Sequence, residues 1–440
     1  MTAIIEPRLP RGMRDILPQK MLQRRYVIGV VERVFERFGF EPLQTPVLEL
    51  QQTLSGKYGP DAEKLIYDAR HREGKEDLAL RYDLSVPLSR VVAMNPELVK
   101  PFKRYQIAPV WRAERPQKGR YREFFQCDAD IVGTSSMLAD AEIVAMIFTI
   151  LRELGFKEFV TKLNNRQVLT ALGEYSGVAP ALLPGLYRSL DKLEKIGRDG
   201  VRAEMLKNEI PDETAKKVLD LTELPVADLN AWREKFREYP IGIQGINELE
   251  ELVQFAREMG VQAERLQIDL TMVRGLEYYT GPIFETVVTE PKIGSLTGGG
   301  RYDGLVGLFS KNSLPATGTS LGIERIIDVM DELNMFPANL PKTVVDVFVT
   351  VFDVARRATS LAIAMSLREA GLDAEVWYDF DGLGKQLRYA AARGIPYVVI
   401  VGPDEAAANV VTLRDLKTGE QIQVTRGEVA NVLKKKIERA

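Results

Sequence analysis

The stretch YQIAPVWRAERPQKGRYREFFQCDADIV, residues 105–132, decides the expected fold of this chain. It places two runs typical of β-strands on either side of a Pro/Gly turn, which predicts an antiparallel hairpin. Alternate side chains of a strand lie on the same face, so Arg112 and Glu114 would share one. An arginine can hold a phosphate through two parallel hydrogen bonds, which makes the hairpin a candidate phosphate site. Taken alone, a charged hairpin is more often a solvated surface.

The composition is that of an ordinary globular protein. The chain has 440 residues, of which 45% are hydrophobic and 28% charged, enough for about three domains. Residues 1–15 lack the apolar core of a signal peptide, and no apolar run is long enough to span a bilayer. We therefore expect a cytoplasmic protein with no membrane partner. The net charge of −3 gives no overall attraction to nucleic acid, so RNA binding would depend on local basic patches.

The chain has one histidine, His71, and one cysteine, Cys127. These counts exclude an internal disulfide and a multi-cysteine zinc site, and they make a Ser-His-Asp triad or a multi-histidine metal site improbable. Chemistry would therefore rest on arginines, carboxylates, tyrosines and backbone groups, with or without a bound cation. We interpret His71 as a solvated loop residue and Cys127 as a packing residue.

The pattern of apolar residues divides the chain into segments. Residues 165–263 are rich in helix signals and charge, with few strand signals, and interrupt a region of mixed strands and helices. A proline-bearing linker follows at residues 334–342, and beyond it strands and helices alternate as in a parallel α/β unit. The expected division is a first domain of residues 1–164 and 264–333, a helical insertion of residues 165–263, and a last domain of residues 343–440.

Three further motifs carry candidate functional groups. Arg274 lies in MVRGLEYYTG, residues 272–281, among glycines that allow close approach of a ligand and beside a pair of tyrosines. A glycine run meets an arginine in TGGGRYDGL, residues 297–305, and Arg325 lies at the start of a predicted helix after GTSLG. Each has a plain structural interpretation: packed tyrosines, a turn, and a surface helix residue. Packing and turn formation alone do not explain why all of these motifs occur in one chain in this order.

Together these motifs resemble those of the class II aminoacyl-tRNA synthetases, and within that class the histidyl-tRNA synthetase family. PRGMRD at residues 10–15 resembles the opening signature of the family. Residues 39–46, 111–130 and 321–325 are similar to the three class II motifs, and RGLEYYTG at residues 274–281 resembles the histidine-specific motif. Residues 385–390 and 411–420 are similar to the family's anticodon-binding domain.

The resemblance implies a fold and an activity. The fold is an α+β catalytic domain, an antiparallel sheet with flanking helices, with the helical insertion and then an α/β anticodon-binding domain. The activity is that of a histidine–tRNA ligase, an enzyme that activates histidine with ATP and transfers it to the 3′ end of tRNA(His). Mg²⁺ is expected with the ATP, and a homodimer is expected from the first motif.

The resemblance also assigns residues, motif by motif. The catalytic residues would be Arg112 and Arg274. The ATP-binding residues would be Arg112, Glu114, Phe124 and Arg325. The histidine-binding residues would be Asp83, Leu84, Ser85, Gln126, Asp130, Arg274, Tyr278 and Tyr279. Contacts to tRNA would come from Gln117, Lys118 and Arg120, and no residue is assigned to a metal. From its position alone, Asp83 is equally well interpreted as a helix N-cap or surface acid.

One residue departs from the family pattern, and one alternative function stays open. Glu277 stands where the family pattern leads us to expect an aspartate, which affects the geometry of Arg274 if the carboxylate sets it. A catalytically silent paralogue, such as the regulatory subunit of ATP phosphoribosyltransferase, would bind histidine as a signal. That paralogue should lack the domain at residues 343–440, and it need not keep Arg112, Glu114 and Arg325 together.

Overall fold

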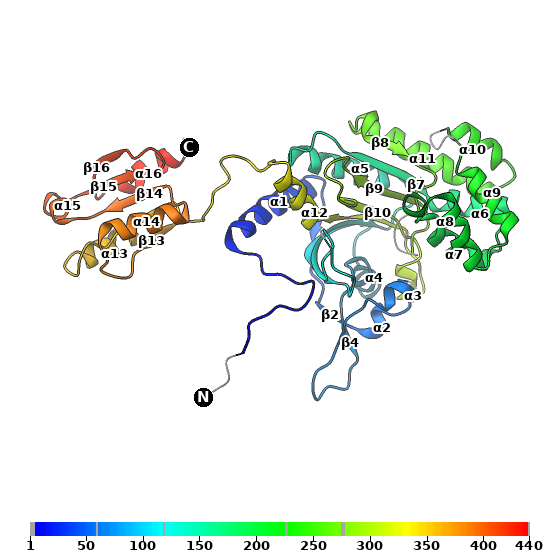
Figure 1. Cartoon of the computed structure of the whole chain (residues 1–440), viewed down its shortest axis with the longest axis horizontal. Helices are drawn as coiled ribbons and strands as arrows, with labels where there is room; N and C mark the ends of the chain where they lie inside the picture. The colour runs from blue at the N-terminus through cyan, green and yellow to red at the C-terminus, as the bar shows by residue number, and fades with distance from the viewer. Residues whose placement is uncertain (1–4, 59, 118, 225–227, 274–277, 439–440) are drawn as a thin grey trace. The chain divides into compact units, whose positions relative to one another are not determined.

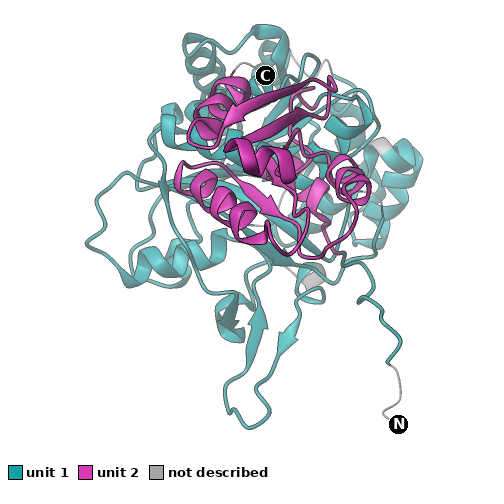
Figure 2. Cartoon of the chain, turned by 90° about the vertical axis from the view of Figure 1, so that its left-hand side faces the viewer, with its two compact units in different colours: residues 1–14, 26–335 teal, residues 15–25, 336–440 magenta. Residues whose placement is uncertain are grey.

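The computed structural model describes residues 5–58, 60–117, 119–224, 228–273 and 278–438. The chain forms two compact units, which are described separately (Figure 2). The first comprises residues 1–14 and 26–335, and the second comprises residues 15–25 and 336–440. Among the described residues, no helix combines the length and the apolar character needed to cross a membrane.

The first unit is built on an eight-stranded sheet. In spatial order its strands are β1 (Glu41–Pro42), β5 (Phe102–Trp111), β6 (Glu123–Val132), β11 (Ala316–Gly322), β10 (Thr297–Arg301), β9 (Pro282–Val287), β7 (Val160–Asn165) and β8 (Leu266–Ile268). The predicted hairpin is present: β5 and β6 pair antiparallel from Phe102↔Val132 to Trp111↔Glu123. The six central strands are antiparallel, as expected, but the two edge strands β1 and β8 are short and pair in parallel.

Helices cover one face of this sheet. The helix α5 (Met137–Glu153) packs against β6, β10 and β11, and α11 (Pro240–Glu258) packs against α5, β7 and β9; Figure 1 shows both along the same side of the sheet. We expected α5 to begin at Asp140, but it begins three residues earlier because the Ser136 side chain accepts a hydrogen bond from the Leu138 N–H. Asp140 is used elsewhere, as the partner of Arg301.

A small sheet and several further helices accompany the large sheet. A three-stranded sheet contains β2 (Leu48–Leu50), β4 (Leu78–Leu80) and β3 (Asp68–Ala69). The helices are α1 (Pro18–Arg37), α2 (Gln51–Leu54), α3 (Pro60–Glu63), α4 (Ser85–Met94) and α12 (Ile323–Glu332), with the 3₁₀ turns η2 (Ala263–Arg265) and η3 (Val306–Leu308). His71 is exposed between β3 and β4, and Cys127 is buried, as both were interpreted.

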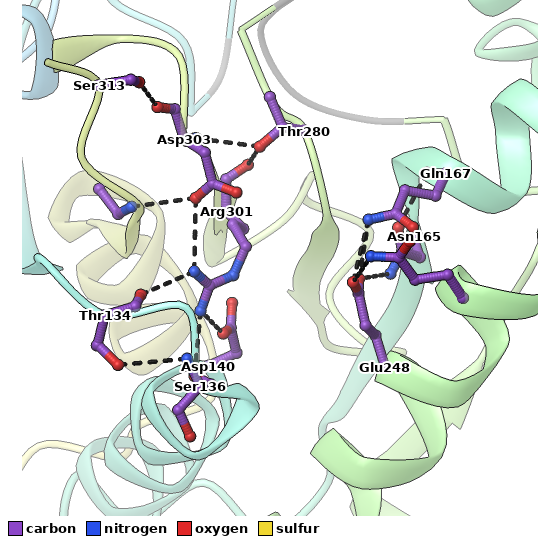
Figure 3. A network of polar contacts seen from close by, with 12 residues as sticks. Thr134, Ser136, Asp140, Asn165, Gln167, Glu248, Thr280, Arg301, Asp303 and Ser313 are labelled. Carbon is purple, nitrogen blue, oxygen red and sulfur yellow. Dashed lines mark hydrogen bonds and ion pairs between the residues drawn. The ribbon is translucent and has the colours of Figure 1, made fainter. Parts of the chain in front are cut away.

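Between β7 and β8 the chain forms a group of helices. They are α6 (Arg166–Ser176), η1 (Pro180–Leu182), α7 (Leu183–Leu190), α8 (Leu193–Lys207), α9 (Asp212–Leu221), α10 (Leu229–Lys235) and α11. Figure 3 shows how the sheet leads into them: Asn165 at the end of β7 caps α6, and its side chain and that of Gln167 both donate to Glu248 on α11. The start of α6 is therefore fixed to the helix that covers the sheet.

The second unit is an α/β domain, as predicted. Its sheet contains β13 (Ala374–Val376), β12 (Val347–Val349), β14 (Tyr397–Ile400), β15 (Val410–Asp415) and β16 (Gln421–Thr425) in spatial order. The first three strands are parallel and the last two form an antiparallel hairpin. Its helices are α13 (Arg357–Glu369), α14 (Leu383–Arg393), α15 (Pro403–Ala408) and α16 (Val429–Ile437). Strand and helix side chains, including Val347, Leu367 and Leu433, form its core.

Candidate active site

The face of the large sheet opposite α5 and α11 borders a cavity of about 1180 Å³. Alternate residues of β6, namely Gln126, Asp128 and Asp130, line it. In the neighbouring strand β11, the residues paired with Gln126 and Asp130 are Gly322 and Gly318. These glycines leave space where side chains would otherwise fill the sheet face, and a Cβ at Gly318 would collide with Oδ1 of Asp130. The cavity therefore forms where polar side chains of β6 lie beside glycines of β11.

Asp130, predicted to read the imidazole, is held in place from two sides. Its Oδ2 lies 2.7 Å from Nη2 of Arg104, and its Oδ1 accepts a hydrogen bond from the Tyr302 hydroxyl. Both members of the ion pair are buried. Burial raises the pKa of Asp130, and the charge of Arg104 opposes this effect. The carboxylate is thus fixed at the base of the cavity.

Asp83 lines the cavity and is buried, so it is not a surface acid; its carboxylate accepts from the first turn of α4, whose N-cap position is Leu84. Oδ1 of Asp83 accepts hydrogen bonds from the Val86 N–H of α4 at 3.1 Å and from the Tyr58 hydroxyl at 2.9 Å. Its Oδ2 accepts from the Tyr278 hydroxyl at 3.5 Å. Burial raises the pKa of Asp83, opposed by the Val86 hydrogen bond and by the charge of Arg112.

The other predicted histidine contacts lie nearby, with one exception. Ser85, Tyr278 and Tyr279 line the same cavity, and the two tyrosine rings pack edge to face with centroids 5.0 Å apart. Leu84 instead packs in a small apolar cluster with Ala108 and Val110, and its carbonyl accepts from Arg104. Leu84 therefore supports Arg104 through its backbone carbonyl, and its neighbours Asp83 and Ser85 line the cavity.

The predicted ATP-binding residues all line the cavity. Nε of Arg112 donates to the Tyr82 carbonyl at 3.1 Å, and the guanidinium lies 4.4 Å from the Tyr82 ring and 5.2 Å from the Phe124 ring. Two aromatic rings therefore fix the plane of this cation. Arg325 is anchored by backbone carbonyls, with Nε donating to Gly119 at 3.0 Å and Nη1 to Ser295 at 2.7 Å.

The loop between β5 and β6 is a tight turn. Gln117 and Arg120 exchange backbone hydrogen bonds of 3.0 and 2.9 Å, and Gly119 has a φ of +69°, a conformation that favours glycine. Nε of Arg120 lies 2.9 Å from Glu114. Of the predicted site residues, Lys118 and Arg274 lie outside the described residues, as does Glu277.

Sequence analysis missed several residues that line the cavity. Asp128 continues the alternation of Gln126 and Asp130 along one strand, a signal that was available. Glu324 on α12 is buried, and its carboxylate accepts from the Phe125 N–H at 3.3 Å. The helical region contributes a wall that no local pattern could predict: Arg166, Tyr187, Arg188, Asp191, Lys192 and Lys195. Among the described residues, no group of three or more His, Cys, Asp or Glu side chains is placed to hold a metal ion.

Comparisons with known proteins agree over nearly the whole chain. The sequence profile of histidyl-tRNA synthetase matches residues 12–326, and that of the anticodon binding domain matches residues 346–436. The histidine–tRNA ligase of Aeropyrum pernix is 42% identical over 433 residues, covering 98% of each chain. That of Cytophaga hutchinsonii is 39% identical, covering 97% of this chain and 99% of the other.

Solved structures give the same picture. Histidyl-tRNA synthetase from Nostoc sp. PCC 7120 is similar with a TM-score of 0.83 at 33% identity, covering 98% of this chain and all of that one. An ATP phosphoribosyltransferase regulatory subunit/histidyl-tRNA synthetase from Bacillus halodurans has a TM-score of 0.71 at 22% identity, covering 85% of this chain and 93% of that one. At that identity the second likeness shows the fold alone.

A sheet of six antiparallel central strands with flanking helices, joined to an anticodon-binding domain, is the architecture of a class II aminoacyl-tRNA synthetase. The profile match over residues 12–326 and the coverage of the relatives narrow this class to one family. The chain belongs to the histidyl-tRNA synthetase family. The predicted family and fold class are thereby confirmed.

Proposed function

We propose that the chain is a histidine–tRNA ligase, which forms histidyl-adenylate from histidine and ATP and transfers the histidyl group to the 3′ end of tRNA(His). One observation carries this proposal. The residues that the family pattern assigns to ATP and those it assigns to histidine, with the exception of Leu84 and of Arg274 outside the described residues, line a single cavity. Such convergence brings two substrates together, which is what the first step of the reaction requires.

In the activation step, a histidine carboxylate oxygen attacks the α-phosphorus of ATP and pyrophosphate leaves. Negative charge grows on the α-phosphate oxygens, and a cation already fixed in position stabilises it without reorganisation. Arg112 fits this role because the Tyr82 carbonyl and two aromatic rings set its orientation. Arg274, in the histidine-specific motif, is proposed as the second cation at this phosphate.

Nucleotide binding is proposed for the same end of the cavity. Phe124 would stack on the adenine, Glu114 would contact its edge, and Arg325 would bind the γ-phosphate. Mg²⁺ would enter with the ATP and would neutralise phosphate charge, with Glu285 and Glu324 as the residues that would hold it. The lining fits such an ion, because Glu285 and Glu324 are buried carboxylates on the cavity wall and Mg²⁺ prefers oxygen ligands.

For histidine, Asp130 and Tyr279 are proposed to bind the two imidazole nitrogens, with Tyr278 lining the pocket. Asp83, Ser85 and Gln126 are proposed for the amino group. Because Arg104 and Tyr302 already hold Asp130, its position does not depend on the ligand. A site whose buried polar groups lose their partners with the wrong ligand rejects analogues strongly.

The transfer step needs tRNA in the same cavity. Gln117, Lys118 and Arg120 are proposed to contact its acceptor end, and the domain of residues 343–440 to bind its anticodon. The proposed division is a catalytic domain of residues 1–164 and 264–333, a helical insertion of residues 165–263 and a linker of residues 334–342. We also propose a homodimer, formed through residues 39–46, that works in the cytoplasm.

The alternative is a silent paralogue that binds histidine as a regulator. The match of residues 346–436 to an anticodon binding domain counts against it, as does the retention of Arg112, Glu114 and Arg325 around one cavity. The ligase is therefore the better supported function.

Histidine-dependent ATP–pyrophosphate exchange tests the proposal. We expect exchange with histidine and none with other amino acids, and a loss of about 10²–10³-fold in kcat for Arg112→Ala and for Arg274→Ala. Arg257→Ala, an exposed arginine on α11, is the matched control and should leave exchange unchanged. Histidine binding without exchange in the unaltered chain would favour the regulatory paralogue.

A further inference from the structure

Asp128 is a buried carboxylate of the cavity that the family pattern leaves without a role. Its side chain is 2% exposed, and it lies between Gln126 and Asp130 along β6. Within the described part of the chain, its Oδ1 has no hydrogen-bond partner, and neither does Oε1 of Gln126. Two neighbouring acceptors at the floor of the cavity therefore lack hydrogen-bond donors. Buried acceptors without donors destabilise the folded chain, unless a bound ligand supplies the missing N–H or O–H groups.

The hydrogen bonds around Ser320 fix which atoms are left over. Nε2 of Gln126 donates to the Ser320 hydroxyl at 2.8 Å. A hydroxyl carries one proton, and Ser320 gives its own to Asp128. This order, from Gln126 through Ser320 to Asp128, leaves the carbonyl oxygen of Gln126 as the acceptor without a partner. An ionised Asp128 thus sets the orientation of the Gln126 amide.

The three carboxylates of the pocket also differ in how many hydrogen-bond donors they already have. Three buried carboxylates lie close together, Asp83, Asp128 and Asp130, whereas the buried cation Arg104 pairs with Asp130. The oxygens of Asp83 already accept from Val86, Tyr58 and Tyr278. Asp128 is consequently the carboxylate with the most unused capacity, and a ligand that is both cationic and rich in N–H donors would complete it.

We propose that Asp128 is the counter-ion of the substrate's α-ammonium group, and that Ser320 positions the Gln126 carbonyl oxygen to accept a second N–H from it. This inference rests on the proposed histidine ligase function and adds two residues to its amino-group site. An ammonium has three donors and no acceptor, which matches a carboxylate oxygen beside an amide oxygen.

The protonation of Asp128 agrees with this role. Burial, opposed by Arg104 and reinforced by Asp130, raises the pKa of Asp128 to about 7. The groups that face it are Arg104 on β5, Asp130 on β6, Ser320 on β11, Asp83 before α4, Tyr279, and Arg81 after β4. An empty pocket therefore holds part of its Asp128 protonated near neutral pH, and a bound ammonium would favour the ionised form.

The test compares histidine with imidazolelactic acid, which carries a hydroxyl in place of the ammonium group. Dissociation constants are measured by calorimetry for the full chain, Asp128→Asn and Ser320→Ala. We expect Asp128→Asn to weaken histidine binding by about 10- to 100-fold, while changing the affinity for imidazolelactic acid less than about 3-fold. Ser320→Ala should weaken histidine binding selectively but less.

Two controls make the result decisive. Asp269 is a buried aspartate outside the cavity, so the variant Asp269→Asn should leave the affinities for both ligands unchanged. ATP binding and the thermal midpoint show that each variant is folded; if Asp128→Asn does not fold, selective loss in Ser320→Ala decides the question. Equal losses for both ligands, or no loss for histidine, would overturn the inference. Absence of histidine-dependent exchange in the unaltered chain would instead refute the proposed function.

Discussion

Two buried arginine–aspartate pairs in the first unit differ in their surroundings. Arg301 at the end of β10 pairs with Asp140 on α5 and donates to the carbonyls of Thr134 and Ser136 at 3.0 and 3.1 Å (Figure 3). Arg104 pairs with Asp130 at 2.7 Å, but this pair lies beside two further buried carboxylates. The first pair matches one charge to one and joins a strand to a helix. The second leaves negative charge facing a cavity, as a site for a cationic ligand requires.

The contrast suggests that similar ion pairs have opposite roles. A balanced pair buried against backbone carbonyls holds elements together, and breaking it exposes an uncompensated charge. Neighbouring carboxylates repel one another, and a cationic ligand that binds among them relieves this repulsion. Substitutions in the two regions should therefore affect stability and binding in opposite proportions.

The largest effect is expected at the balanced pair. Asp140→Asn leaves the charge of Arg301 buried without its partner, and should reduce the free energy of unfolding of the first unit by about 3–5 kcal/mol. Chemical denaturation followed by circular dichroism measures the change. Asp303→Asn is the matched control, since its side chain is 43% exposed and 3.5 Å from Arg301, and should cost less than about 1 kcal/mol. Equal losses of unfolding free energy for Asp140→Asn and Asp303→Asn would contradict the structural role proposed for the pair of Arg301 and Asp140.

An intermediate effect is expected at the glycine beside Asp130. Gly318→Ala places a methyl group against Oδ1 of Asp130, and must displace either the carboxylate or the strand. We expect a loss of about 1–3 kcal/mol in unfolding free energy together with weakened histidine binding. Gly298→Ala serves as the stability control because an added Cβ there meets no atom within 4 Å. Normal histidine affinity in Gly318→Ala would show that the position of Asp130 is less constrained than the packing indicates.

Sequence patterns predicted the parts of the fold that depend on local signals. The hairpin of β5 and β6 was predicted from strand alternation around a Pro/Gly turn, and the motifs located Arg112, Glu114 and Arg325. The family pattern named Gln126 and Asp130, whereas Asp128 between them was passed over because no motif names it, although strand alternation places it on the same face. The start of α5 was predicted at Asp140 but lies at Met137, because Ser136 caps the helix.

What the sequence could not predict depends on contacts between distant segments. Arg188 and Lys192 reach the cavity only because the helices after β7 fold back over the sheet, and their local pattern is that of any charged helix. Ser320 acquires its role because it pairs opposite Asp128, which lies 192 positions earlier in the chain (from 128 to 320). Long-range pairing of this kind leaves no local signature.

The smallest effect is expected for the stability of the unliganded Asp128→Asn variant. The pKa of Asp128 is raised to about 7 in the folded chain, above the unfolded value near 4. Between these values the folded state binds the extra proton, so the unfolding free energy contributed by this residue falls as pH rises from about 4 to 7 and stays low above it. Asparagine cannot ionise, so the unfolding free energy of the variant should rise relative to that of the unaltered chain as the pH rises.

We expect the unliganded variant to gain about 1 kcal/mol of unfolding free energy relative to the unaltered chain between pH 6 and pH 8, where Asp128 of the folded chain loses its proton. Chemical denaturation at both pH values measures the difference. Saturating histidine should reverse the order at pH 8, since only the ionised aspartate gains from the ammonium group. A variant that is less stable at pH 8 without ligand would place Asp128 with Asp140, as a structural rather than a ligand-binding carboxylate.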